Sequence, residues 1–172
     1  MAVVRKFYNP EGLGKRVIDG KLLYSHVVTV RGGTRVILAG QVPRAEDGSV
    51  IAPGDMRGQI VATCENIKKG LAAAGATFND VVRSTTYVTD MQEYFRHVSA
   101  RMPYFAADPP TSTTVQVSAL AHPDFKVEIE VEAVLDEAPP ARPAARASAR
   151  RPQRAPARRA SRPPAARPRR RR

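Results

Sequence analysis

The segment from residue 109 to residue 135 carries the clearest pattern in the chain, PPTSTTVQVSALAHPDFKVEIEVEAVL. Near its end, apolar residues alternate with acidic ones: Val127, Ile129, Val131 and Ala133 with Glu128, Glu130 and Glu132. Side chains of a strand point alternately to two faces, so the pattern predicts a β-strand with one apolar face and three carboxylates on the other. Either these carboxylates form a solvated acidic face, or one of them lies in a cleft and takes part in chemistry.

Positive charge is concentrated after residue 137. Residues 138–172 contain 13 Arg and otherwise only Ala, Pro, Ser and Gln. The whole chain has 28 Lys+Arg and 16 Asp+Glu, which leaves 15 basic and 16 acidic residues for positions 1–137. A body of that length can enclose one hydrophobic core. We therefore expect a folded domain over residues 1–137 and a disordered Arg/Pro/Ala-rich C-terminal tail over residues 138–172.

The composition also suggests partners and a compartment. An arginine-rich tail neutralises phosphates, so residues 138–172 predict non-specific binding of nucleic acid. The alternative is a solubilising extension without a selected partner. Cys64 is the only cysteine, the N-terminus lacks the apolar stretch of a signal peptide, and no run approaches the ~20 apolar residues of a membrane helix. These features predict a soluble cytoplasmic protein that does not enter a membrane.

The remaining patterns predict the other elements of the body. We expect strands over residues 3–8, 22–30, 34–38 and 81–89, with a loop over residues 10–21 and a tight hairpin turn at residues 31–33. One helix begins after Asp55 and ends at Gly75, and its apolar stripe takes in Cys64, which we interpret as a buried small hydrophobe. A second helix follows Asp90 and ends near Pro103. The prediction is an α+β fold, a mixed β-sheet with two helices on one face.

Several short motifs occur in an order that is informative as a set. They are Tyr24–Val28 (YSHVV), Val36–Gln41 (VILAGQ), the helix with Gln59, Asn66 and Ile67 that runs into Ala74-Gly75-Ala76, Thr86–Met91 (TYVTDM), Pro109–Leu120 (PPTSTTVQVSAL) and Val127–Glu130 (VEIE). With these motifs the chain resembles the RidA family (YjgF or Rid) of enamine/imine deaminases. The resemblance implies a chorismate-mutase-like fold and a homotrimer whose ligand sites lie between subunits. It also implies hydrolysis of reactive 2-imino or 2-enamino acids to 2-keto acids and ammonia, without a metal or an organic cofactor.

The resemblance assigns roles to individual residues. Glu128 matches the glutamate that positions or activates the attacking water, and a carboxylate can pass the proton of that water to the departing amine. Tyr24 matches a pocket tyrosine. Gly40 and Thr114 match positions that contact the ligand through the backbone, and Tyr87 is expected to line the cleft.

One position departs from the family pattern. Its deaminases carry an arginine two residues after the proline of a Pro-x-Arg-Ser motif, where it grips the substrate carboxylate by two parallel hydrogen bonds. This chain has Ser112 there, and a serine cannot form such a fork. Arg83 and Arg101 are the arginines that the fold could bring to the site.

Three functions therefore stay open. The chain is a Rid-type hydrolase with Glu128 as its catalytic residue, a non-catalytic protein that binds a small ligand in the same pocket, or a nucleic-acid-associated protein that acts through its tail. His26, His97 and His122 do not have the spacing of metal ligands, so we expect no metal site.

Overall fold

The computed structural model of the chain describes residues 2–105 and 108–136. The predicted tail over residues 138–172, and with it the nucleic-acid contact assigned to it, lies outside the described residues. Within the described part, no helix is both long and apolar enough to cross a membrane.

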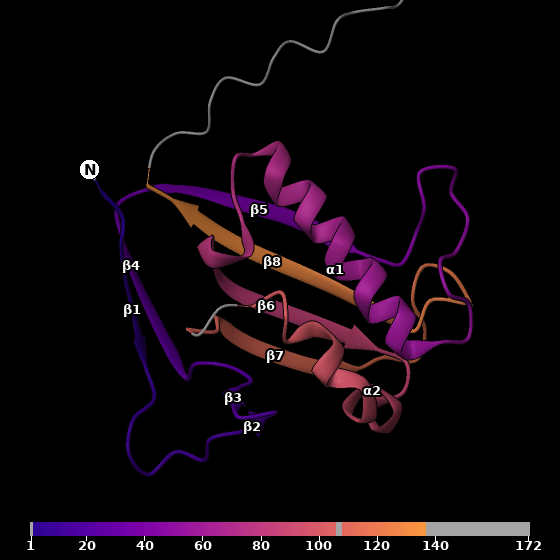
Figure 1. The fold of residues 1–172 in the computed structure, drawn as a ribbon, viewed down its shortest axis with the longest axis horizontal. Helices are drawn as coiled ribbons and strands as arrows, with labels where there is room; N and C mark the ends of the chain where they lie inside the picture. Colours follow the sequence, from indigo (N-terminus) through magenta and orange to yellow (C-terminus); the bar gives the residue numbers. More distant parts are fainter. Residues whose placement is uncertain (1, 106–107, 137–172) are drawn as a thin grey trace, which may run out of the picture. The chain divides into compact units, whose positions relative to one another are not determined.

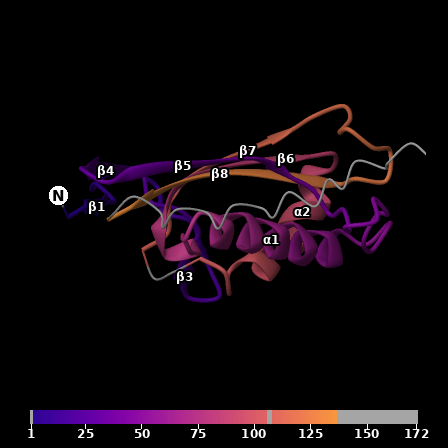
Figure 2. The same cartoon turned by 90° about the horizontal axis from the view of Figure 1, so that it is seen from above.

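A four-stranded sheet forms the centre of the fold (Figure 1). Its strands lie in the order β5 (Thr34–Gln41), β8 (Val127–Leu135), β6 (Val81–Val88) and β7 (Thr111–Gln116). β8 runs antiparallel to both of its neighbours, whereas β6 and β7 run parallel. Figure 2 shows that α1 (Met56–Ala73) and α2 (Met91–His97) cover the same face of this sheet. The predicted mixed sheet with two helices on one face is confirmed.

The alternating pattern on β8 has the predicted consequence. The apolar set of β8 is at most 3% exposed and belongs to the core: Val127, Ile129, Val131 and Ala133. The three glutamates between them are only partly buried, on the face that the helices leave open. The strand therefore connects the hydrophobic core to a polar sheet face.

The N-terminal strands depart from the prediction. β4 (Val27–Arg31) pairs with β1 (Val4–Tyr8), while β5 pairs with β8, so the predicted hairpin between residues 22–30 and 34–38 is wrong. Two short strands, β2 (Val17–Ile18) and β3 (Lys21–Leu22), also pair within and beside the predicted loop. Only glycine fits between the two strands, because Gly33 has a φ of +84° and a Cβ there would lie 2.7 Å from a Val3 methyl carbon. The chain passes between packed strands at this point instead of folding back.

The first helix follows its predicted stripe and its predicted end. Ile60, Cys64, Ile67 and Leu71 have no measurable exposure, so the interpretation of Cys64 as a buried hydrophobe is confirmed. Burial raises the pKa of this thiol to about 12. Gly75, at φ +77°, ends the helix in a Schellman motif in which the Ala76 N–H donates to the carbonyl of Leu71.

The second helix is shorter than predicted. Asp90 caps it by accepting a hydrogen bond of 2.8 Å from the Glu93 N–H. The α-helix ends at His97 and continues as a 3-10 turn over Val98–Arg101, ahead of Pro103. The predicted stripe is buried all the same: Tyr94, Val98, Met102 and Phe105.

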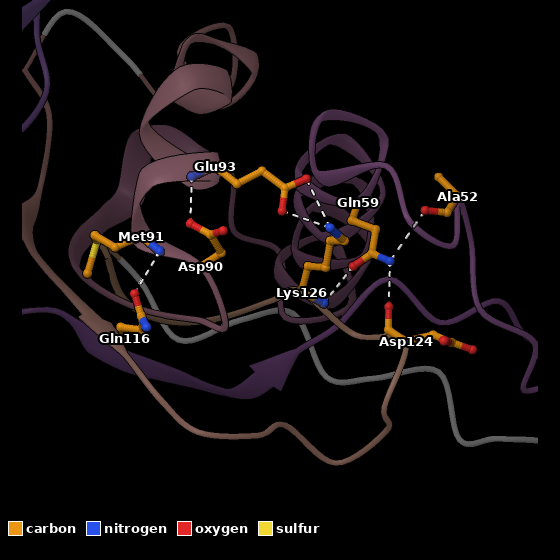
Figure 3. Close-up of polar contacts among 8 residues, drawn as sticks. All are labelled: Ala52, Gln59, Asp90, Met91, Glu93, Gln116, Asp124 and Lys126. Carbon is orange, nitrogen blue, oxygen red and sulfur yellow. Dashed lines mark hydrogen bonds and ion pairs between the residues drawn. The ribbon is translucent and has the colours of Figure 1, made fainter.

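A polar network holds the segment that leads into β8 (Figure 3). The Gln59 amide of α1 donates 2.7 Å to the Asp124 carbonyl, and its oxygen accepts 2.8 Å from the Lys126 N–H. The Lys126 ammonium forms an ion pair of 2.7 Å with Glu93 of α2. Both helices therefore fix the residues directly before Glu128.

We expect Gln59→Leu to destabilise the fold by about 2–4 kcal/mol, because it removes both hydrogen bonds of the buried Gln59 amide and leaves the Asp124 carbonyl and the Lys126 N–H without these partners. Urea unfolding followed by circular dichroism measures the effect. The matched control is Gln92→Leu on the exposed side of α2, which we expect to change stability by no more than about 0.5 kcal/mol. Equal effects of the two substitutions would show that the Gln59 contacts contribute nothing.

Candidate functional site

The open face of the sheet brings acidic and aromatic side chains together. In the β6–β8 ladder, Tyr87 is the register partner of Glu128, Thr85 of Glu130 and Arg83 of Glu132. Register partners in adjacent strands present their side chains on the same face. Charged and hydroxyl groups of two central strands therefore form one polar surface.

The three carboxylates of β8 have different partners. Glu132 forms an ion pair of 2.8 Å with Arg35, and Glu130 accepts a hydrogen bond of 3.2 Å from the Tyr87 hydroxyl. Glu128 has no hydrogen bond or ion pair with any of the residues that the structure describes. It is therefore the carboxylate that is available to a water molecule or a ligand.

Gly40 makes room for that carboxylate. The register between β5 and β8 shifts between Leu38 and Gln41, so Gly40 lies on an irregularity of the strand. A Cβ at Gly40 would lie 2.8 Å from the carboxyl carbon of Glu128 and closer still to its Oε1 atom. The Glu128 side chain thus lies directly against the backbone of β5, as the absence of a side chain permits.

The surroundings favour the protonated form of Glu128. Partial burial, and then the negative charge of Glu130, raise the pKa of the Glu128 carboxyl. Burial and the hydrogen bond to Glu130 also raise the pKa of the Tyr87 hydroxyl, so this tyrosine stays a hydrogen-bond donor. A carboxyl with a raised pKa is suited to accept a proton and return it in one reaction cycle.

Two depressions lie beside this cluster. One, of about 310 Å³, is on the open face, and residues of β5, β6 and β8 line it, among them Ala39, Arg83, Thr85 and Glu130. The other, of about 530 Å³, extends from Gly40 and Gln41 to Asn66 and Lys69 of α1. Ala39 and Gly40, consecutive in β5, thus line one depression each.

The other predicted pocket residues form a second group at β7. The Ser25 N–H donates a hydrogen bond of 3.0 Å to the carbonyl of Pro110. This bond connects the segment that contains Tyr24 to the start of β7. Ser112 is within 3.1 Å of the buried Ser84 hydroxyl, and Thr114 is the register partner of the buried Thr86. Ser112 and Thr114 therefore share the helix-covered face of the sheet.

Within one chain, the predicted site residues thus divide between the two faces of the sheet. Glu128, Gly40 and Tyr87 come together on the open face, whereas Tyr24, Ser112 and Thr114 belong to the β7 group. Of the two arginines considered from the sequence, Arg83 lies exposed beside the first group and Arg101 lies buried near the second.

Sequence reasoning missed Ser84, which connects Ser112 to the interior. A signal for it existed: Ser84 shares one face of β6 with Val82, Thr86 and Val88, so it occupies a core-facing position. A hydroxyl at such a position requires a buried polar partner.

In residues 2–105 and 108–136, no group of three or more His, Cys, Asp or Glu side chains could hold a metal ion. His26 contacts Asn9 at 3.1 Å, and His122 stacks against Phe125 with ring centroids 5.2 Å apart.

Comparison with known proteins identifies the scaffold. Residues 17–135 match the family described as endoribonuclease L-PSP. The chain belongs to the Rid (YjgF) family. A solved structure of YyfB from Yersinia pestis, described as a Rid family protein of unknown function, is 34% identical with a TM-score of 0.68. The match covers 76% of this chain and 98% of YyfB.

Two further relatives are informative. Protein DfrA of Myxococcus xanthus is 40% identical over 111 residues, which are 64% of this chain and 84% of DfrA. The solved structure of Escherichia coli TdcF has serine bound to it. TdcF is 31% identical with a TM-score of 0.54, and the match covers 60% of this chain and 82% of TdcF. Rid membership thus rests on sequence and on fold together.

Proposed function

We propose that this Rid protein is a hydrolase that releases ammonia from a reactive enamine or imine, with Glu128 as its catalytic residue. The observation that carries the proposal is the Glu128 carboxylate, which lies against Gly40 without a partner among the described residues and has a raised pKa. The bound serine of the relative TdcF supports a small-molecule site in the family.

The chemistry needs only one carboxylate and one water molecule. Glu128 takes a proton from the water while the oxygen of the water attacks the C=N carbon, and it passes this proton to the nitrogen, which forms a carbon carrying both a hydroxyl and an amino group. The carboxylate then takes the proton of the hydroxyl and gives it to the nitrogen, so that the C–N bond breaks, the C=O bond forms and ammonia leaves. A raised pKa favours proton transfer from the carboxyl group to the nitrogen, and the Tyr87 hydroxyl donates a hydrogen bond to the neighbouring Glu130 carboxylate.

We propose further that the complete site forms between subunits of a homotrimer. The supporting observation is the division of the site residues between two faces, which leaves each group incomplete in one chain. The open sheet face also exposes apolar side chains, Ile37 at 69% and Val115 at 39%. A symmetric assembly would bury these side chains and bring the β7 group of one subunit to the Glu128 group of another.

Ser112 favours a second candidate, a Rid protein that binds a small ligand without converting it. Its hydroxyl lacks the fork and the charge that hold a carboxylate by two hydrogen bonds. In this candidate the ligand occupies the same pocket and is returned unchanged. The tail-driven association with nucleic acid is independent of both candidates.

Ammonia release from a panel of freshly generated imines, some neutral and some with a carboxylate, tests the hydrolase. We expect release above the buffer rate from at least one class, because Glu128 and its water act on the C=N carbon whatever the rest of the molecule carries. Ligands recovered unchanged after stoichiometric binding would instead establish the second candidate. No release and no binding across the panel would refute both.

A further inference from the structure

A buried arginine lies behind the β7 group. The Arg101 side chain is 2% exposed, and its guanidinium lies over the ring of Phe105 at 4.3 Å. Nη1 donates 3.2 Å to the Tyr94 hydroxyl and Nη2 donates 3.3 Å to the Ser84 hydroxyl. Every hydrogen-bond partner of this cation in the described chain is thus a neutral oxygen.

The charge of Arg101 has no counterion in the described part of the chain. None of the ion pairs there includes it, and a guanidinium does not lose its proton at any physiological pH. An isolated buried charge is costly, and hydroxyls and an aromatic face compensate it only in part. An anion within reach would complete the compensation.

The hydrogen bonds around Arg101 lead outward to β7. Arginine only donates, so the Ser84 oxygen must accept from it, and the single Ser84 proton is left to point at the Ser112 oxygen, 3.1 Å away. Ser112 accepts that bond and keeps its own proton for another acceptor. Each donor in such a chain polarises the next, so the charge of the guanidinium strengthens the Ser112 hydroxyl as a donor.

Two buried hydroxyls near the Arg101–Ser84–Ser112 hydrogen bonds also lack partners. Ser25, whose N–H bonds to the Pro110 carbonyl, is 2% exposed, and its hydroxyl forms no hydrogen bond among the described residues. The hydroxyl of Thr86, next to Ser84 on the same face of β6, is fully buried and also has none. The polar groups near Ser112 therefore exceed what the chain itself satisfies, as in a site built for a polar ligand.

From these contacts we propose that Arg101 is a positioning residue that gives the site a preference for carboxylate ligands. It acts through Ser84 and Ser112, and its charge takes the place of a guanidinium on β7 itself. The Ser112 hydroxyl is the group that touches the carboxylate. This inference rests on the proposed function, because the Ser112 group and the Glu128 group form one pocket only in the proposed homotrimer.

The test compares binding of 2-oxobutanoate with binding of its neutral amide, 2-oxobutanamide, to the full chain by calorimetry at one fixed ionic strength. We expect the acid to bind about 10- to 100-fold more tightly than the amide, the range for a hydrogen bond to a charged group. Arg101→Met should bring this ratio close to one, and Arg101→Lys should retain part of it. The basic tail is the same in every variant, so differences in this ratio between variants do not come from its attraction for anions.

Two more variants separate recognition from structure. The double variant Arg101→Met, Ser112→Arg should regain the preference, since its guanidinium stands on β7 directly. Arg83→Met, on the opposite face of β6, is the matched control and should keep the ratio of the native chain.

The inference is overturned if the native chain shows no preference for the acid, if Arg101→Met keeps the preference, or if Arg83→Met removes it. If Arg101→Met does not fold, the binding ratio of Ser112→Ala tests the inference instead. This variant leaves Arg101 in place and removes only the hydroxyl that donates to the carboxylate. An unchanged ratio in that variant refutes the relay. A protein that prefers the acid but releases no ammonia refutes the hydrolase and leaves this inference standing.

Discussion

Glu128→Gln is expected to lower the rate of ammonia release by about 100-fold or more, the lower end of what a positioned proton acceptor contributes. The amide fills the same space against Gly40 but cannot take a proton from water. Initial rates on whichever imine the native protein converts, measured at several pH values, give the comparison. The residual activity should also lose the dependence on pH that the Glu128 carboxyl imposes. A variant that turns over at the native rate would remove Glu128 from the mechanism.

The stability of Glu128→Gln shows whether unfolding causes its loss of ammonia release. Burial raises the pKa of Glu128 in the folded state above its value in the unfolded chain, so the folded state binds the proton more tightly. The free energy of unfolding therefore falls as the pH rises from the pKa of Glu128 in the unfolded chain to its pKa in the folded state. The loss is complete at pH values above both. We expect Glu128→Gln to be more stable than the native chain at neutral pH, with the difference closing on acidification.

Gly40→Ala is expected to reduce turnover by about 100-fold while the fold stays within about 1 kcal/mol of the native stability. The added methyl group would meet the end of the Glu128 side chain, which can rotate away, and no backbone atom is among its closest neighbours. The strand therefore tolerates the change, but the carboxylate leaves the position in which it can hold a water molecule. Rates and urea unfolding on the same preparation measure both effects.

Gly14→Ala is the control for that experiment. A Cβ at Gly14 meets nothing within 4 Å, so this variant carries the same substitution without touching the site, and it should keep native turnover. A Gly40→Ala protein that is fully active would contradict the assigned position of the Glu128 carboxylate. A Gly40→Ala protein that is inactive because it is unfolded would contradict the expectation that β5 accepts a methyl group at this position.

The sequence predicted the elements better than their pairing. Alternation on β8 and the stripe of α1 are local patterns, and burial follows directly from them. The partner of β4 could not be predicted in this way, because two adjacent strands with glycines between them favour a hairpin on local grounds. The pairings that form instead, β4 with β1 and β5 with β8, join segments that are distant in sequence.

The candidate site shows the same limit. The resemblance to Rid proteins pointed to Glu128 and Gly40, and the structure places these two side by side. Neither the resemblance nor the spacing indicated that Ser112 faces the interior, where it meets Ser84. That contact depends on the parallel register of β6 and β7, and a register between strands separated by a helix is not encoded in any single segment.

The division of Glu128 and Ser112 between opposite faces of one sheet bears on how such proteins diversify. Substitutions at positions that share no partners add in their effects on folding, so a lineage can try new residues on β7 without disturbing the carboxylate on β8. Selection could thus exchange an arginine for a serine, or reverse the exchange, in a single step. The scaffold would then serve as an adaptable platform in which the reaction is inherited and the choice of substrate evolves.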